Sequence, residues 1–220
     1  MKKLITIILL LFLSFSYGQK RELRNANKFY DSGEFSSALD LLESSKVLFD
    51  SSDDKVKSQQ MLLYGKIHTS MQDFSLAMEA FNISKDLGIS SDQLGPELMR
   101  LENSIITNAI ADQESGNSLD AAIKLKMAYD LNPEVNQDYL YFAAGNAVNS
   151  INYSLALEYY LLLRDINYDG VTTKFYITEV ESGNEIEISS VDEFNLLQKS
   201  KDYDNPCLLY TSDAADDRMR

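Results

Sequence analysis

The stretch GKIHTSMQDFSLAMEAFNISKDL, from Gly65 to Leu87, decides the fold because three other stretches share its order of small and large residues. A small residue opens it, an aromatic stands nine places later, an alanine follows three places on, and a large apolar residue comes four places after that. The other copies start at Ala26, Ala109 and Ala144. An order that recurs along a chain predicts a repeated structural unit.

The shared order predicts a helical hairpin in each copy. Two helices cross closely only where a side chain is missing, and a large residue fills the space beside the crossing. The small residues that open the copies are, in chain order, Ala26, Gly65, Ala109 and Ala144, and nine places later stand Phe35, Phe74, Ser118 and Tyr153. The alanines that follow are Ala38, Ala77, Ala121 and Ala156, and the large apolar residues are Leu42, Phe81, Leu125 and Tyr160. Gly33 and Gly116 are expected to break the chain between paired helices, and Asn132-Pro133 to end a second helix.

This pattern resembles the tetratricopeptide repeat (TPR), whose period is 34 residues. Pro133 stands where that family has its closing proline, although Glu22, Met61, Ile105 and Leu140 occupy the family's tryptophan position. The resemblance covers residues 20–168. It implies an all-α solenoid, in which residues 19–168 form four TPR-like hairpins. The third copy is predicted to have a long first helix that starts near Pro96, because no breaker follows before Gly116.

The N-terminus has the features of a secretory signal. Lys2 and Lys3 precede an apolar run, residues 4–15, and small residues flank a cleavage site after Gly18. The run has roughly 12 residues, whereas a membrane span needs roughly 20, so a signal peptide (residues 1–18) is favoured over a membrane anchor. Cleavage would leave a periplasmic or otherwise exported chain with no membrane insertion.

The periodicity changes after Asp169. Residues 172–180 and 185–189 read as two strands of a small β-hairpin, and Ser190–Glu193 reads as a capping box that opens a short helix. A hairpin after a helical pair resembles exported TPR proteins of Gram-negative bacteria, so residues 169–206 are predicted to be an insertion near the C-terminus. Its face with Phe175 and Ile177 is expected to pack on the fourth copy or on further repeats.

The tail from Cys207 to Arg220 is unlike the rest of the chain. Written as codons, residues 207–217 resemble translated sequencing-adapter DNA, so residues 207–220 are predicted to be artefactual and the natural part of the chain to be a fragment truncated at about Pro206. The alternative is a genuine polar tail with one free thiol. Without Cys207 the chain contains no cysteine, and no disulfide is expected.

The net charge and the motifs narrow the function classes. The formal charge of −14 becomes −16 without Lys2 and Lys3, which disfavours nucleic acid as a partner. The single histidine, His68, is expected to pack in the core, and the sequence has no phosphate loop, dinucleotide glycine set or zinc spacing. We therefore expect a protein that is not an enzyme and needs no cofactor.

One short stretch resembles the opening of a calcium loop. Asp165, Asn167, Asp169 and Gly170 have the spacing of D-x-N-x-D-G, in which alternate oxygens converge on the cation. The loop also needs a bidentate acid at its twelfth place, and that place holds Tyr176. The stretch is therefore interpreted as a helix end followed by a turn, and cation binding is left open.

The leading hypothesis is a non-catalytic scaffold that binds a protein or peptide partner on a concave helical surface. The resemblance places the first helices of the hairpins on that surface. Its predicted partner-binding residues are Leu23, Asn27, Tyr30, Leu62, Lys66, Ile106, Ile110 and Tyr141, with Thr69, Gln113, Gly145 and Val148 beside them. The alternatives are an accessory or anchoring region of a larger envelope protein or enzyme, whose active part lies beyond residue 206, and self-association through an uncapped repeat edge.

Overall fold

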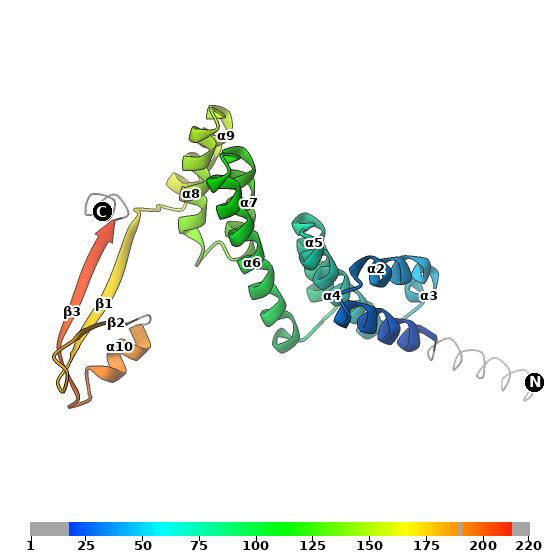
Figure 1. Ribbon diagram of the computed structural model, residues 1–220, viewed down its shortest axis with the longest axis horizontal. Coiled ribbons are helices and arrows are strands. Elements are labelled where there is room, and N and C mark those ends of the chain that lie inside the picture. Colours follow the sequence, from blue (N-terminus) through cyan, green and yellow to red (C-terminus); the bar gives the residue numbers. More distant parts are fainter. Residues whose placement is uncertain (1–17, 189–190, 213–220) are drawn as a thin grey trace, which may run out of the picture. The chain divides into compact units, whose positions relative to one another are not determined.

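The computed structural model describes residues 18–188 and 191–212 (Figure 1). The chain is mostly helical and has a small antiparallel sheet near its C-terminus. It divides into two compact units, one that ends at Leu163 and one that begins at Arg164. Residues 1–17 of the predicted signal peptide, Ser189 of the predicted second strand, Ser190 of the predicted capping box and the last eight residues of the tail lie outside the described residues.

The helical unit consists of short helices joined by tight turns. A helix over residues 18–31 is followed by α2 (Phe35–Ser44), α3 (Lys46–Asp50), α4 (Asp54–Met71), α5 (Phe74–Asp86), α6 (Ser91–Glu114), α7 (Ser118–Leu131), α8 (Gln137–Asn149) and α9 (Tyr153–Asp165). Helix α4 packs against α2, α3, α5 and α6, and α7 packs against α6 and α8. Helices α4 and α7 therefore each contact the helix before and the helix after them in the sequence.

Helix α6 is the longest of these helices, with 24 residues, and it corrects one prediction. The sequence placed its start near Pro96, but the helix begins at Ser91, so the proline lies inside it. Pro96 has no N–H to donate to the carbonyl of Asp92, and the helix tolerates this loss near its N-terminus. The extra turn adds Leu94 to the core, where it packs with Leu101.

The four turns that lie inside the four sequence copies have the same backbone geometry. Each contains a residue with a left-handed φ, and these residues are Gly33, Gln72, Gly116 and Ile151, at φ 78°, 65°, 79° and 61°. In each turn the next N–H donates to the carbonyl five residues earlier, at 2.8–3.0 Å; the donors are Glu34, Asp73, Asn117 and Asn152. This bond is the wider one of a Schellman helix end. The breaks predicted at Gly33 and Gly116 are confirmed, and two further turns reach the same geometry without glycine.

The small residues that define the sequence pattern are all buried. Ala26, Ala38, Ala77, Ala109, Ala121, Ala144 and Ala156 are at most 3% exposed, and Gly65 is buried as well. One apolar cluster joins the helix over residues 18–31 to α2, α3 and α4, and another joins α4 and α5 to α6 and α7. The cores therefore form where the pattern predicted close approach of helices.

The C-terminal unit contains a three-stranded antiparallel sheet with the order β2-β1-β3. Strand β1 (Val171–Glu179) pairs with β2 (Glu185–Ile188), which confirms the predicted hairpin. Helix α10 (Val191–Leu197) packs on this sheet, and Ile177 is buried among Ile188 and Phe194. The Phe175 and Ile177 face, which was expected to pack on the helical copies, is thus covered by α10.

Strand β3 (Tyr203–Ser212) was not predicted. It pairs with β1 from Tyr203 opposite Glu179 to Ser212 opposite Val171, so part of the tail from Cys207 onward lies in the sheet. The register shifts between Tyr176 and Thr178, beside Asn205 with φ 50°. A proline in this run, Pro206, is tolerated because β3 lies at the edge of the sheet.

Candidate functional site

Two of the predicted partner-binding residues meet on neighbouring first helices. Tyr30 lies on the helix over residues 18–31 and Lys66 lies on α4. The ammonium nitrogen of Lys66 is 4.7 Å from the centre of the Tyr30 ring, within the range of a cation–π contact. The Lys66 side chain is 22% exposed, and Tyr30 is 9% exposed. The Tyr30 ring is therefore the buried partner of this contact, and Lys66 is the partner that solvent reaches.

Helix α6 adds a carboxylate and a guanidinium to this pair. Glu97 Oε1 is 3.5 Å from Lys66 Nζ, and Arg100 Nη1 is 4.0 Å from Glu97 Oε2. Arg100 Nη1 also donates to the Tyr30 hydroxyl, and Arg100 Nη2 donates to Ser70 Oγ at 3.2 Å. We call Tyr30, Lys66, Ser70, Glu97 and Arg100 the first-helix cluster. It links three helices that are each the first of a pair.

The first-helix cluster is positive although the chain is strongly acidic. It contains two cations and one carboxylate, whereas the whole chain carries −14. Arg100 is 50% exposed, so part of its guanidinium fork faces solvent. A guanidinium and an ammonium beside a phenol can hold a carboxylate or a backbone carbonyl of another molecule. The first-helix cluster can therefore bind another molecule through charge and hydrogen bonds.

Four predicted partner-binding residues lie in or against the core. Leu62 is 8% exposed and packs in the cluster with Phe74 and Phe81. Leu23 and Ile106 are half-buried against core clusters, and Asn27 Nδ2 donates to the carbonyl of Leu23 at 2.8 Å. These side chains therefore take part in the packing between helices, and Leu62 is the most buried of them.

The remaining two predicted residues, Ile110 on α6 and Tyr141 on α8, are exposed. Ile110 is 51% exposed and Tyr141 is 38% exposed. The ring of Tyr141 lies edge-on to that of Phe142, with centroids 5.8 Å apart. The two helices are also linked by Asn146 Nδ2, which donates to Gln113 Oε1 at 3.3 Å. These side chains add apolar surface to the first helices of copies three and four.

The sequence prediction missed Ser70, Glu97 and Arg100. The repeat alignment pairs Lys66 with Ile110, 44 residues later, so it passes over Glu97 and Arg100. A 34-residue offset, that of the TPR, would have paired Lys66 with Arg100. The same separation joins Gln59 on α4 to Gln93 on α6, whose side chains form a hydrogen bond of 3.2 Å.

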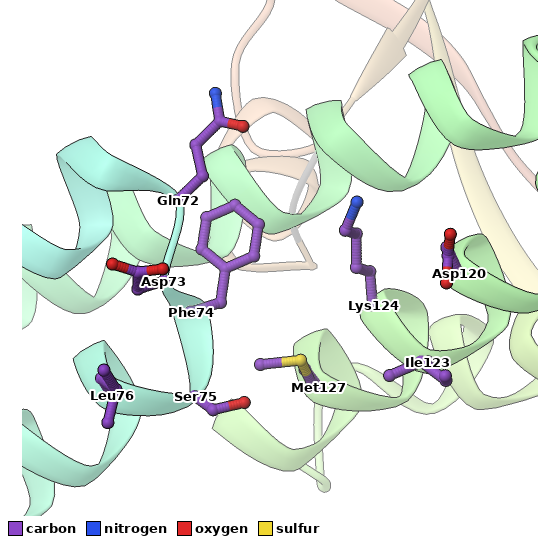
Figure 2. Close-up of a pocket in the computed structure, with 9 residues that line it drawn as sticks. All are labelled: Gln72, Asp73, Phe74, Ser75, Leu76, Asp120, Ile123, Lys124 and Met127. Atoms are coloured by element: carbon purple, nitrogen blue, oxygen red, sulfur yellow. The ribbon is translucent and has the colours of Figure 1, made fainter.

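A groove of about 440 Å³ lies between the start of α5 and α7. Figure 2 shows Met127 extending from α7 toward Ser75 and Phe74, with Lys124 and Asp120 farther along α7. Lys124 is held by an ion pair with Asp112 of α6. The groove combines an apolar floor with a charged rim.

A second groove, of about 620 Å³, contains His68. The His68 ring stacks on Tyr64, with centroids 6.2 Å apart, and His68 Nδ1 is 3.5 Å from Asp73 Oδ2. Burial, together with the charge of Glu43, raises the pKa of Tyr64 to about 12, against a lowering effect of its hydrogen bond with Gln60. His68 is 12% exposed at its side chain and belongs to neither core cluster of the helical unit, so it is a partly buried residue of the groove lining and not the core residue that was predicted.

Metal ligands do not converge in the part of the chain that the structure describes. Among residues 18–188 and 191–212, no group of three or more His, Cys, Asp and Glu side chains could hold a metal ion. In the stretch that resembles a calcium loop, the guanidinium of Arg164 donates to Asp165 Oδ1 at 2.7 and 3.0 Å. Asn167 and Gly170 have left-handed φ values of 55° and 67°, which is consistent with a turn after α9.

The chain matches no protein-family model and no curated protein sequence. Within residues 18–188 and 191–212, none of the helices combines the length and the apolar character that a membrane crossing requires.

Proposed function

We propose that this protein is a non-catalytic scaffold of TPR-like helical hairpins that binds a protein or peptide partner across its first helices. The observation that carries the proposal is the first-helix cluster. Tyr30, Lys66 and Arg100 come from three helices in different copies, and their accessible polar atoms lie together. A surface shared by several repeats is how stacked hairpins bind extended segments.

The repeat geometry supports this proposal. The turn inside each of the four copies has one residue with a left-handed φ and the same hydrogen bond, as expected if one unit recurs along the chain; the turn after α5, at Gly88, also has this geometry. First helices are linked by side-chain hydrogen bonds between residues 34 and 33 positions apart, Gln59 with Gln93 and Gln113 with Asn146. The copies themselves start 39, 44 and 35 residues apart, so the connections between them are longer than in a strict 34-residue repeat.

The partner chemistry follows from the two parts of the surface. The first-helix cluster favours a carboxylate or a backbone carbonyl, because Lys66 and Arg100 outnumber the one carboxylate of Glu97. Ile110 and Tyr141 offer apolar anchors farther along the copies. An extended segment with an acidic part and an apolar part would match both. The signal-like N-terminus places the encounter outside the cytoplasm in this proposal.

Site-specific photo-crosslinking tests the proposal. A benzoylphenylalanine at position 110 or 141 should capture the same partner, since both positions lie on exposed first-helix surface. The matched control is position 47 on α3, where Val47 is 83% exposed. Capture from 110 and 141 should be lost in Arg100→Glu and should not occur from 47. Equal capture from all three positions, or capture that ignores Arg100→Glu, would refute this surface.

A further inference from the structure

The helix over residues 18–31 carries a row of cations on its exposed side. Lys20, Arg24 and Lys28 follow one another at intervals of four residues, and all three residues are exposed. Residues four apart are neighbours on one face of a helix, so the three cations form a single row, which we call the basic stripe. The basic stripe contrasts with the chain as a whole, which carries a net charge of −14.

The basic stripe is not neutralised within the described part of the chain. Over residues 18–188 and 191–212, no ion pair or hydrogen bond involves a side chain of the stripe, although the whole chain has 34 acidic residues against 20 lysines and arginines. Glu22 of the same helix is paired with Arg21, at 2.9 Å. Even with Asp31, which follows Lys28 by three residues, the stripe keeps an excess of positive charge.

This arrangement costs the free chain stability. Lys20 with Arg24, and Arg24 with Lys28, are like-charged pairs four residues apart, and such pairs destabilise a helix. A negative group between two cations relieves their repulsion, because it attracts both. Since the described residues supply no such group, the basic stripe is suited to the anionic groups of another molecule.

The spacing of the stripe selects the kind of anion. Successive members are about 6 Å apart along the helix axis, because each residue of a helix rises roughly 1.5 Å. In an extended segment, side chains on the same side are two residues apart, or about 6.6 Å. Carboxylates at alternate positions of an extended segment therefore match the stripe one to one. A flat anionic membrane matches it less well, because it would also repel the other carboxylates of this acidic chain.

We propose that the basic stripe binds an extended acidic segment of another protein, with aspartate or glutamate at every second position. Each cation pairs with one carboxylate, and the guanidinium of Arg24, in the centre, can bind its carboxylate through two parallel N–H bonds. The contact is exposed, so it should weaken as salt screens the charges. The inference is independent of the proposed function, because no residue of the stripe belongs to the first-helix cluster.

Fluorescence anisotropy with a labelled peptide tests the proposal. The probe is a peptide of seven residues in which threonine and glutamate alternate, with both ends blocked, and it is titrated with the whole chain at low salt. A chain with Lys20→Glu, Arg24→Glu and Lys28→Glu should raise the peptide Kd at least tenfold. The control chain makes the same change in net charge at exposed lysines of α3, α4 and α5 and should change the Kd less than threefold; its substitutions are Lys46→Glu, Lys55→Glu and Lys85→Glu.

Circular dichroism of both variants shows that the fold is retained. An absence of peptide binding to the wild-type chain would overturn the proposal, as would equal losses in the two variants. Binding to vesicles of phosphatidylglycerol but not to the peptide would also overturn it, and would assign the basic stripe to a membrane surface.

Two further measurements test the spacing and the location. A peptide of the same composition with its glutamates in one block should bind at least threefold more weakly, because its carboxylates point to alternating sides. Arg100→Glu, which disrupts the first-helix cluster, should change the Kd of the alternating peptide less than threefold. Equal binding of the two peptides would overturn the match in spacing. A loss in Arg100→Glu as large as that in the stripe variant would place the peptide on the first-helix cluster and overturn the proposal.

Arg24→Gln tests whether the stripe costs the free chain stability. Arginine and glutamine have similar helix propensities, so the substitution mainly removes the two like-charged pairs. At low salt the melting temperature of Arg24→Gln should rise while its affinity for the alternating peptide falls. A lower melting temperature would show that contacts within the fold hold Arg24, and the basic stripe would then not be available to a partner.

Discussion

Gly65 on α4 lies directly against the ring of Phe81 on α5. A Cβ added at Gly65 would be 2.8 Å from Cζ of that ring and closer still to Cδ1 and Cε1. Phe81 is 1% exposed and has no room to move outward. We expect Gly65→Ala to destabilise the helical unit by about 1–3 kcal/mol, the usual cost of overpacking a core. Urea unfolding followed by circular dichroism measures this change.

Gly145 on α8 is the matched control for Gly65. A Cβ there meets nothing within 4 Å, although Gly145 also lies inside a first helix of a copy. Gly145→Ala should stabilise the chain by up to about 1 kcal/mol, because alanine is the better helix former. If both substitutions have the same sign, the close approach at Gly65 is not what holds α4 to α5.

Ile151 adopts a left-handed backbone that isoleucine disfavours. Its φ is 61° and its side chain is 72% exposed, so replacing it removes strain and little packing. Ile151→Gly should raise the free energy of unfolding by about 1 kcal/mol, the balance of released strain and the greater freedom of glycine in the unfolded chain. The melting temperature should rise accordingly.

The control for Ile151 is Val148→Gly, three residues earlier inside α8. Val148 is 40% exposed, and glycine in a helix interior costs about 1 kcal/mol. The two glycine substitutions should therefore shift the melting temperature in opposite directions. A fall for Ile151→Gly would mean that this turn is not strained.

The sequence predicted most of the helical unit because its signal is local and repeated. Gly33 and Gly116 marked two turns correctly, since glycine is the residue that a left-handed φ favours. Gln72 and Ile151 also have a left-handed φ, and the turns at these residues could not be predicted, because neither side chain favours that conformation. The repeat register was the only clue to those turns.

Strand β3 and the contacts of Arg100 depend on residues that are far apart in the sequence, so the local pattern did not predict them. Strand β3 was missed because the tail from Cys207 onward was predicted to be artefactual, and the strand forms because it pairs with β1. Arg100 was missed because its partners Tyr30 and Ser70 are 70 and 30 residues away. Such separations are fixed by the packing of helices and not by the local pattern.

Tyr64 should make the chain sensitive to alkaline pH. Its pKa is raised to about 12 chiefly by burial, whereas an unfolded tyrosine ionises near pH 10. Between these values the folded state holds a proton that the unfolded state has lost, so stability falls as the pH rises from 10 toward 12. In Tyr64→Phe this fall should be shallower. Melting temperatures measured from pH 8 to pH 12 give the comparison.

Tyr139 offers a second test of the same effect. Burial raises its pKa in the same direction, followed by the effects of Glu102 and Asp138. Tyr139→Phe should therefore also reduce the alkaline loss of stability. An identical pH profile for wild type and Tyr64→Phe would show that the Tyr64 phenol is not held protonated by the fold.

Arg100 and Tyr30 should be energetically coupled because the guanidinium donates to the phenol hydroxyl across copies. A double-mutant cycle with Tyr30→Phe and Arg100→Ala isolates this bond, since the cycle cancels the other contacts of Arg100. We expect a coupling of about 1 kcal/mol in the free energy of unfolding, the net value of one such hydrogen bond. Urea unfolding of the four proteins provides it.

The control cycle pairs Tyr30→Phe with Lys126→Ala on α7, where Lys126 Nζ is 2.7 Å from Asp130 and the two side chains form a local ion pair. Those two substitutions should be additive, because neither residue shares a partner with the other. If the Tyr30 and Arg100 changes are additive as well, the first helices of the copies are not joined through the first-helix cluster. The proposed binding surface would then lack the rigid centre from which Lys66 and Arg100 present their charges to a partner.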